Sequence, residues 1–258
     1  TAVSVSAGGA HTCAVLDDAT LKCWGAPDQG ALGTGNTNNY VGDGAGEMGD
    51  NLSAVELGTG RTAVSVSAGE QHTCAMLDDA TLKCWGKGAD GQLGTGSTNN
   101  VGGVASEMGD ALAALELGTG RTAVSVSAGG FHTCAVLDDA TLKCWGRGNR
   151  GQLGTGSTSD VGDAAGEMGD ALAAVDLGTG RTAVSVSAGI YHTCAVLDDA
   201  TLKCWGYGDY GQLGTGSTSN VGGAAGEMGD ALAAVDLGTG RTAVSVSAGS
   251  FHTCAVLD

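Results

Sequence analysis

Nine cysteines recur at fixed spacing, and their thiols are the most conspicuous chemical groups of the sequence. Eight of them form four pairs of equal separation, namely Cys13 with Cys23, Cys74 with Cys84, Cys134 with Cys144, and Cys194 with Cys204, whereas Cys254 stands alone. Such pairs can be local disulfides, reduced buried thiols or part of a metal site. A metal site is disfavoured because each unit offers one histidine and two cysteines and no Cys-x-x-Cys knuckle.

The register of the predicted hairpin decides whether two paired sulfurs can meet. If Asp138-Asp139-Ala140 forms a three-residue loop, Cys134 lies directly opposite Cys144, with their Cα atoms about 4.5 to 5.5 Å apart. A two-residue loop would place the sulfurs on opposite faces. The disulfide hypothesis therefore predicts the three-residue loop. It also implies an oxidising compartment, so we expect a secreted or extracellular protein.

Histidines occur once per unit, two residues before the first cysteine, at His11, His72, His132, His192 and His252. Catalysis needs one asymmetric constellation, whereas these residues repeat in every unit. We interpret them as structural histidines that bond neighbouring backbone. No Ser-His-Asp order, phosphate-binding loop or paired-carboxylate cleft stands out, so we predict that the chain is not an enzyme.

Acidic loops provide one weak candidate for a metal. Four carboxylates lie within eleven residues, at Asp160, Asp163, Glu167 and Asp170, and oxygen-rich loops suit Ca²⁺. The second unit keeps only Glu107 and Asp110, which favours a solvated acidic face, and we expect no cofactor. Separately, Asn51-Leu52-Ser53 is a lone glycosylation sequon.

All these residues belong to an internal repeat. The segment Thr-Ala-Val-Ser-Val-Ser-Ala-Gly recurs at steps of 61, 60, 60 and 60 residues, with Tyr40 as the extra residue. The units are therefore residues 1–61, 62–121, 122–181 and 182–241, followed by a partial fifth unit at 242–258.

Each unit has the periodicity of β-strands. In residues 122–128, Val124 and Val126 alternate with serines, which is the pattern of a half-buried strand. Residues 132–137 and 141–145 flank the Asp-Asp-Ala loop, and residues 171–177 favour a fourth strand over a short helix. Four short strands per unit are typical of one propeller blade.

Three motifs carry a resemblance to a known family. The segment GGFHTCAVLDDATLKCWGRGNRGQLGTG contains a Gly-x-x-His, a hairpin that ends in Trp-Gly, and a Gly-Gln-Leu-Gly. In this order they resemble the regulator of chromosome condensation (RCC1-like) repeat family, in a secreted, cysteine-containing variety. The resemblance covers nearly the whole chain and implies β-propeller-type blades, usually seven in a ring. It leaves function open, since such propellers act as exchange factors, enzyme inhibitors or recognition modules.

The sequence departs from the family pattern at the hairpin and in the number of units. Alanine occupies the usual glycine of the hairpin in every unit, for example at Ala140, and a left-handed alanine would cost about 1 kcal/mol. Ala31 replaces the glutamine of the other units. Seven blades would need more residues than the chain has, and residues 242–258 repeat residues 1–17. We therefore expect an all-β, open arc of four-stranded antiparallel blades, rather than a closed ring.

Differences among the copies concentrate in two loops, which we predict as partner-contact loops. One precedes each histidine and the other follows each Trp-Gly. Aromatic and basic side chains there would make good binding anchors, although loops also tolerate drift. The candidate residues are Glu70, Gln71, Phe131, Arg147, Arg150, Ile190, Tyr191, Tyr207, Tyr210 and Phe251.

Composition limits the partners. The formal net charge is −17, with only 15% charged residues, so the surface repels phosphate, which disfavours nucleic acid and anionic membranes as partners. Near-identity of the units favours a non-enzymatic, extracellular structural protein, self-associating or part of a longer array or filament. The alternative is a protein-recognition or enzyme-inhibitor propeller that uses the variable loops. An exchange factor for a small GTPase is disfavoured, because it would act inside the cell, where paired cysteines are rare.

Overall fold

Each repeat folds into a small antiparallel sheet, and the computed structural model describes residues 1–258. The inner strands are β1 (Ala2–Ala7), β4 (Ala63–Ala68), β7 (Ala123–Ala128), β10 (Ala183–Ala188) and β13 (Ala243–Ala248). The middle strands are β2 (His11–Leu16), β5 (His72–Leu77), β8 (His132–Leu137), β11 (His192–Leu197) and β14 (Thr253–Leu257). The outer strands are β3 (Leu21–Gly25), β6 (Leu82–Gly86), β9 (Leu142–Gly146) and β12 (Leu202–Gly206).

The only helices are single 3₁₀ turns in the long loops. They are η1 (Asp28–Gly30), η2 (Gly49–Asn51), η3 (Ala105–Glu107), η4 (Gly109–Ala111), η5 (Gly169–Ala171) and η6 (Gly229–Ala231). None has the length or hydrophobicity of a membrane-spanning helix.

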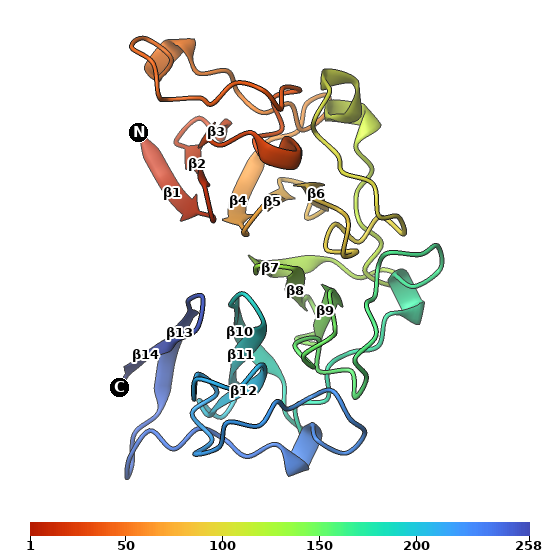
Figure 1. Cartoon of the computed structure of the whole chain (residues 1–258), viewed down its shortest axis with the longest axis vertical. Helices are drawn as coiled ribbons and strands as arrows, with labels where there is room; N and C mark the ends of the chain where they lie inside the picture. Colours follow the sequence, from red (N-terminus) through yellow and green to blue (C-terminus); the bar gives the residue numbers. More distant parts are fainter.

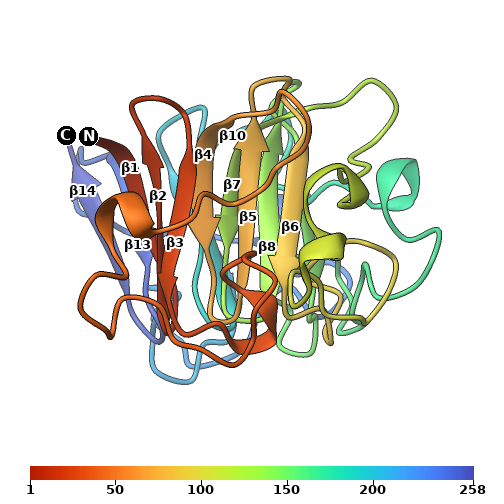
Figure 2. The same cartoon turned by 90° about the horizontal axis from the view of Figure 1, so that it is seen from above.

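The sheets stand side by side around an open arc, as the sequence predicts. Four sheets have three strands, β13 pairs only with β14, and no strand pairs with a strand of another sheet. Figure 1 shows the inner strands turned toward the centre of the arc and a gap between β1 and β14. Seen from the side, the strands run roughly along one common direction, so every blade presents its loops to the same two faces (Figure 2).

The fourth strand expected at residues 171–177 does not form, so the prediction of four-stranded blades is wrong. Ala171 ends η5, and Val175 donates the one backbone hydrogen bond by which this segment joins its blade, to Leu142 O. The Leu177 carbonyl instead accepts from the Lys203 ammonium of the next blade. The segment therefore bridges two blades, and each blade has three strands.

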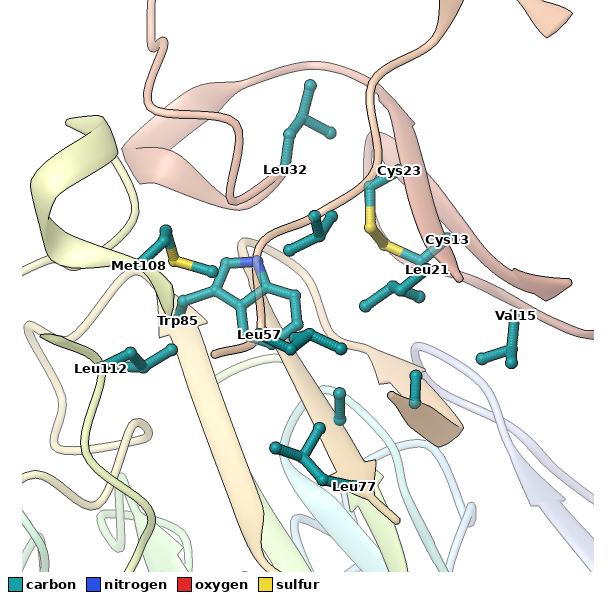
Figure 3. Close-up of a cluster of buried hydrophobic side chains, with 13 residues drawn as sticks. Cys13, Val15, Leu21, Cys23, Leu32, Leu57, Leu77, Trp85, Met108 and Leu112 are labelled. Atoms are coloured by element: carbon teal, nitrogen blue, oxygen red, sulfur yellow. A yellow bond between two sulfur atoms is a disulfide. The ribbon is translucent and has the colours of Figure 1, made fainter. Parts of the chain in front are cut away.

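The hydrophobic core lies between consecutive blades. Along a middle strand, cysteine and valine (Met76 in β5) face the following blade, whereas alanine and leucine face the preceding one. In the first core, Cys13, Val15 and Leu21 of one blade pack against Leu77 and Trp85 of the next. Figure 3 shows the Trp85 indole enclosed by Leu32, Leu57 and Met108, with the Cys13–Cys23 disulfide beside it. The same arrangement recurs at the next two interfaces, so each blade depends on its neighbour for burial.

All four predicted disulfides are present. They join Cys13 to Cys23, Cys74 to Cys84, Cys134 to Cys144, and Cys194 to Cys204, while Cys254 is free and exposed. The three-residue loop is the one found, since Val136 pairs with Leu142. The Cα atoms are 4.1 Å apart, closer than expected. The cysteines occupy non-hydrogen-bonded positions of the hairpin, where strands approach most closely.

The inner strands correct one detail of the predicted burial pattern. Val124 is 55% exposed, although alternation places it with Val126 on the buried side. The register of β7 and β8 shifts between Ala123 and Ser125, so a bulge turns Val124 out of the pleat. Ala123 is buried in its place.

The hairpin alanines give a first testable prediction. Ala140 has φ of 62°, as do its counterparts in the other three full units, and this left-handed conformation is costly for a residue with a Cβ. Ala140→Gly is expected to raise the free energy of unfolding by about 1 kcal/mol. Urea unfolding measures the change. Ala135→Gly, in the neighbouring strand, is the control and should lower stability; a loss at residue 140 would contradict the prediction.

Candidate functional site

Polar side chains connect the blades and set the spacing of their loops. The Nε2 atom of each histidine in the full units lies 2.8 to 3.0 Å from a threonine hydroxyl of the following blade, for example His132 from Thr193. Each buried tryptophan donates from Nε1 to a backbone carbonyl of the preceding blade, as Trp145 does to Gln92 O at 3.0 Å. The histidines thus bond threonine side chains and not, as we expected, neighbouring backbone.

The hydrogen bond of Trp85 bears on one departure from the repeat pattern, the alanine at residue 31 where later units have glutamine. Trp85 donates to the backbone carbonyl of Ala31, at the position that is Gln92 or Gln152 in later units. Because the main chain supplies this acceptor, alanine can provide it. The Gln92 and Gln152 side chains also accept from the backbone N–H groups of Asp90 and Arg150, a contact that Ala31 cannot make.

Burial keeps the histidines neutral. It lowers the pKa of His72 and His132 to about 3, and that of His11 and His192 to about 4. Neutral imidazoles that bridge blades in a repeating ladder hold the arc together, and their arrangement provides no asymmetric catalytic centre.

The two variable loops of each blade lie at the same end of the sheet and are tied together by backbone hydrogen bonds. Arg147 N donates to Phe131 O, and Tyr207 N donates to Tyr191 O. The loops before the histidines also meet between blades, since Gly130 N donates to Gly189 O. Residues 60 positions apart in the sequence therefore become neighbours on one surface.

Five aromatic side chains from these loops form a continuous group, here called the aromatic rim cluster: Phe131, Tyr191, Tyr207, Tyr210 and Phe251. Phe131 stacks on Tyr191 with ring centroids 5.0 Å apart, and Tyr191 meets the edge of Tyr207 at 6.2 Å. Tyr207 and Tyr210 both contact Phe251, at 6.4 and 5.2 Å. Tyr210 is 68% exposed, so part of the cluster faces solvent.

Basic side chains border the aromatic rim cluster. The Lys87 ammonium and the Arg147 guanidinium lie 4.8 and 5.0 Å from the Phe131 ring centroid, and Arg150 lies 5.2 Å from that of Tyr207. The Asp90 carboxylate neutralises Lys87 and Arg147, since its oxygens lie 3.3 Å from Lys87 Nζ and 3.1 Å from Arg147 Nε. Arg150 makes no ion pair, so its charge remains available. A hydrogen bond with Asp209 raises the pKa of Tyr207.

The structure brings together seven of the ten predicted loop residues. Glu70 and Gln71 contribute no ring or charge to the cluster: the Gln71 carbonyl accepts from Lys87 N, and the Glu70 side chain lies close to Gly9 of the first blade. Ile190 instead packs its backbone against Gly130. The sequence prediction missed Lys87 and Asp90 as members of the border, although both lie in the same variable loop and differ between units.

The calcium candidate is not assembled as a site. Asp160 accepts from Gly148 N, Glu167 from Gly162 N and Ala164 N, and Asp170 from Thr119 of the preceding repeat. Burial raises the pKa of Asp163. No group of three metal-ligating side chains occurs in the chain, because these carboxylates serve as local acceptors for backbone amides and a threonine.

The glycosylation candidate Asn51 lies at the end of η2 and is exposed. Its side-chain nitrogen donates to Gly46 O at 2.7 Å. The atom that would carry a glycan is therefore engaged in a loop hydrogen bond.

Comparison with known sequences identifies the repeats. The model of the regulator of chromosome condensation (RCC1) repeat matches residues 2–31, 63–92, 123–152 and 183–212. The chain belongs to the RCC1 repeat family. Human E3 ubiquitin-protein ligase HERC2 is 27% identical over 219 residues, and the Arabidopsis thaliana ultraviolet-B receptor UVR8 is 31% identical over 217. These matches cover 85% and 83% of this RCC1-repeat chain but only 4% and 43% of the two relatives.

Solved structures of similar fold extend the comparison. Human WBSCR16 superimposes with a TM-score of 0.73 at 19% identity, over 100% of this chain and 58% of that protein. Saccharomyces cerevisiae Prp20p gives 0.69 at 19%, over 99% and 56%. The chain thus spans somewhat more than half of these two proteins, and at such identity the likeness concerns the fold alone.

Proposed function

We propose that this RCC1-repeat chain is a non-catalytic scaffold that binds another protein through the aromatic rim cluster. The observation that carries the proposal is the convergence of the variable residues. The repeats are otherwise nearly identical, yet seven of the ten variable residues predicted as partner contacts meet in one partly exposed group of aromatic and cationic side chains. Large aromatic residues and arginine dominate the energetics of protein interfaces.

The chemistry of the cluster suggests what a partner would present. Phe251 and Tyr210 offer exposed ring surface, and Arg150 offers an unpaired positive charge beside them. A partner with an apolar side chain next to a carboxylate would satisfy both. Saccharomyces cerevisiae Prp20p has binding properties toward Gsp1p and histones. This supports protein binding as a general use of such scaffolds.

We also propose that the protein works outside the cell. Four disulfides, one in every full repeat, support an oxidising compartment, since such bonds are rare in the cytosol. The chain recovered from its native source is then expected to hold one reactive thiol, that of Cys254.

Removing part of the aromatic rim cluster tests the binding role. The double variant Phe131→Ala, Tyr191→Ala is expected to capture its partner from the extracellular fluid of the source cells at least about tenfold more weakly than the parent chain, because two anchors are lost. Quantitative mass spectrometry of the captured proteins measures the loss. Tyr40→Ala is the matched control, since Tyr40 is 57% exposed and lies in another repeat. Equal capture by the parent and the double variant would contradict the proposal.

A second candidate is a structural role within a longer or self-associating array of repeats, as the near-identity of the units favours. It is supported by the stacking of the blades, because each blade buries its core against its neighbour.

A further inference from the structure

The long loop of the first repeat surrounds a polar pocket. The pocket has a volume of about 630 Å³, which lies within the range of small-molecule sites. Residues 33–56 supply most of its wall, and Ala105 and Met108 of the second repeat complete it. Figure 1 shows this loop, drawn in orange, at the outer edge of the arc and away from the inner strands.

Four departures of the first repeat from the repeat pattern converge on this pocket. Tyr40 is the extra residue of the first unit, and Asn36 stands where the other three full units have serine. Asn51 and Ser53 stand where those units have alanine. All four residues line the pocket. Each change adds an aromatic ring or hydrogen-bonding groups to the same space.

The single proline of the chain adds a further amide to the pocket. In the second repeat the Asn100 side chain accepts from Gly88 N across the base of the loop, and the third and fourth repeats make the same bond. Pro27 occupies the corresponding position of the first repeat and has no N–H to donate. Asn39, the counterpart of Asn100, therefore cannot make this bond, and it lines the pocket.

The loop backbone holds two of these amides in place and leaves one polar atom of each free. Asn36 Oδ1 accepts from the N–H groups of Asn38 and Asn39 at 2.8 and 3.3 Å, so its Nδ2 atom can donate to a ligand. Asn51 Nδ2 donates to Gly46 O at 2.7 Å, so its Oδ1 atom can accept. A hydroxyl group both donates and accepts, and it can therefore bond either amide. Side chains that are already held lose little conformational freedom on binding.

Charge and ring chemistry restrict the class of ligand. No lysine, arginine or histidine lines the pocket, whereas Glu47 and Glu56 do, so a phosphate, sulfate or carboxylate group is repelled. Tyr40 is 57% exposed and offers an apolar ring face beside the amides. A pyranose ring matches this combination, because it has an apolar C–H face and hydroxyl groups along its edge.

Repeats on either side of the loop leave such a pocket accessible. The second repeat has a neighbour on each side, and its residues Ala111 and Ala113 are exposed. Their counterparts in the first repeat, Asn51 and Ser53, are exposed as well. The opening of the pocket is therefore a property of the loop itself.

We propose that the pocket in the long loop of the first repeat binds a neutral saccharide. A pyranose ring stacks on Tyr40, and its hydroxyl groups bond Asn36 Nδ2 and Asn51 Oδ1. The site uses residues of the first two repeats, whereas the aromatic rim cluster begins at Phe131 in the third. The inference therefore adds a second binding site to the protein-binding role.

Titration of the intact chain with neutral disaccharides tests the site. The probes are cellobiose, maltose and N,N′-diacetylchitobiose, and the shifts of the asparagine side-chain amides in nuclear magnetic resonance spectra measure binding. At least one probe is expected to bind with a Kd of about 1 mM or lower. A sulfated heparin disaccharide should not bind, because Glu47 and Glu56 repel it.

Variants of the wall separate saccharide binding from an effect on folding. Asn51→Ala installs the residue of the other three full repeats, so the fold is kept, and it should weaken binding about fivefold. Tyr40→Ala should weaken binding about tenfold, whereas Tyr40→Phe, which keeps the ring, should retain most of the affinity. Asn38→Ala is the matched control, because Asn38 belongs to the same loop but does not line the pocket.

Absence of binding by all three neutral probes at about 10 mM would overturn the proposal, as would equal affinity of the parent chain and Asn51→Ala. Equally tight binding of the sulfated disaccharide would overturn it too. So would a glycan on Asn51 in the chain from its native source, detected by intact mass, since that glycan would occupy the pocket. Tyr40→Ala changes no residue of the aromatic rim cluster, so failure here leaves the protein-binding role to its own test.

Discussion

Full reduction of the four disulfides is expected to unfold the chain at neutral pH. Each bond joins residues separated by ten positions, and closing such a loop contributes about 2–3 kcal/mol. The four together amount to about 10 kcal/mol, which is comparable with the whole stability of a typical domain. The paired sulfurs belong to fully buried side chains, so reduction should follow opening of the blades, and the blades should not close again in reductant.

Circular dichroism during urea unfolding, with and without dithiothreitol, measures this loss. Thiol titration gives an independent count, with one reactive thiol expected in the native chain and nine after denaturation and reduction. Cys254→Ser is the control variant, because it removes the free thiol and should leave the sensitivity to reductant unchanged. Five or more reactive thiols in the native chain, or an unchanged unfolding midpoint in dithiothreitol, would contradict the prediction.

Local features were predictable from the sequence because they depend on few residues. The register of one hairpin follows from the length of its loop, so Asp138-Asp139-Ala140 was enough to place Cys134 opposite Cys144. The left-handed alanine at the third loop position follows from the same turn geometry. In both cases the determining contacts lie within a dozen residues of one another.

Contacts between blades were harder to predict, because a sequence pattern does not say what covers a strand. Residues 175–177 alternate as a strand would, yet the Leu177 carbonyl is taken by Lys203, which no local pattern indicates. The threonine partners of the histidines escaped prediction for the same reason. One signal was available: in an array of stacked blades, equivalent positions of successive units become neighbours. This rule would have placed Phe131 beside Tyr191.

The histidine ladder makes the array sensitive to mild acid. His72 and His132 have pKa values of about 3 in the folded chain because they are buried, and His11 and His192 about 4. The unfolded chain binds these protons near pH 6.5, so it holds more protons than the folded chain between pH 6.5 and about 4. Stability is therefore complete above pH 6.5 and falls as the pH decreases through this window. At pH 5 each buried histidine lowers the free energy of unfolding by about 2 kcal/mol relative to neutral pH, so four histidines lower it by about 8 kcal/mol.

Urea unfolding between pH 7.5 and pH 5 tests this expectation. Burial is the main cause of these low pKa values, and neighbouring imidazoles add to the cost of protonating His72 and His132, as Lys87 does for His72. Hydrogen bonds lower the pKa of Asp110 and Asp170 below 3.8, so these carboxylates titrate below the pH range of the histidine effect and do not mask it.

His132→Asn should reduce the slope of stability against pH by about one proton, or about 1.4 kcal/mol per pH unit. His252→Asn, which removes an exposed histidine outside the ladder, is the control variant. A flat stability profile, or an imidazole of His132 that titrates near pH 6.5 by nuclear magnetic resonance, would show that the ladder is not held neutral by burial.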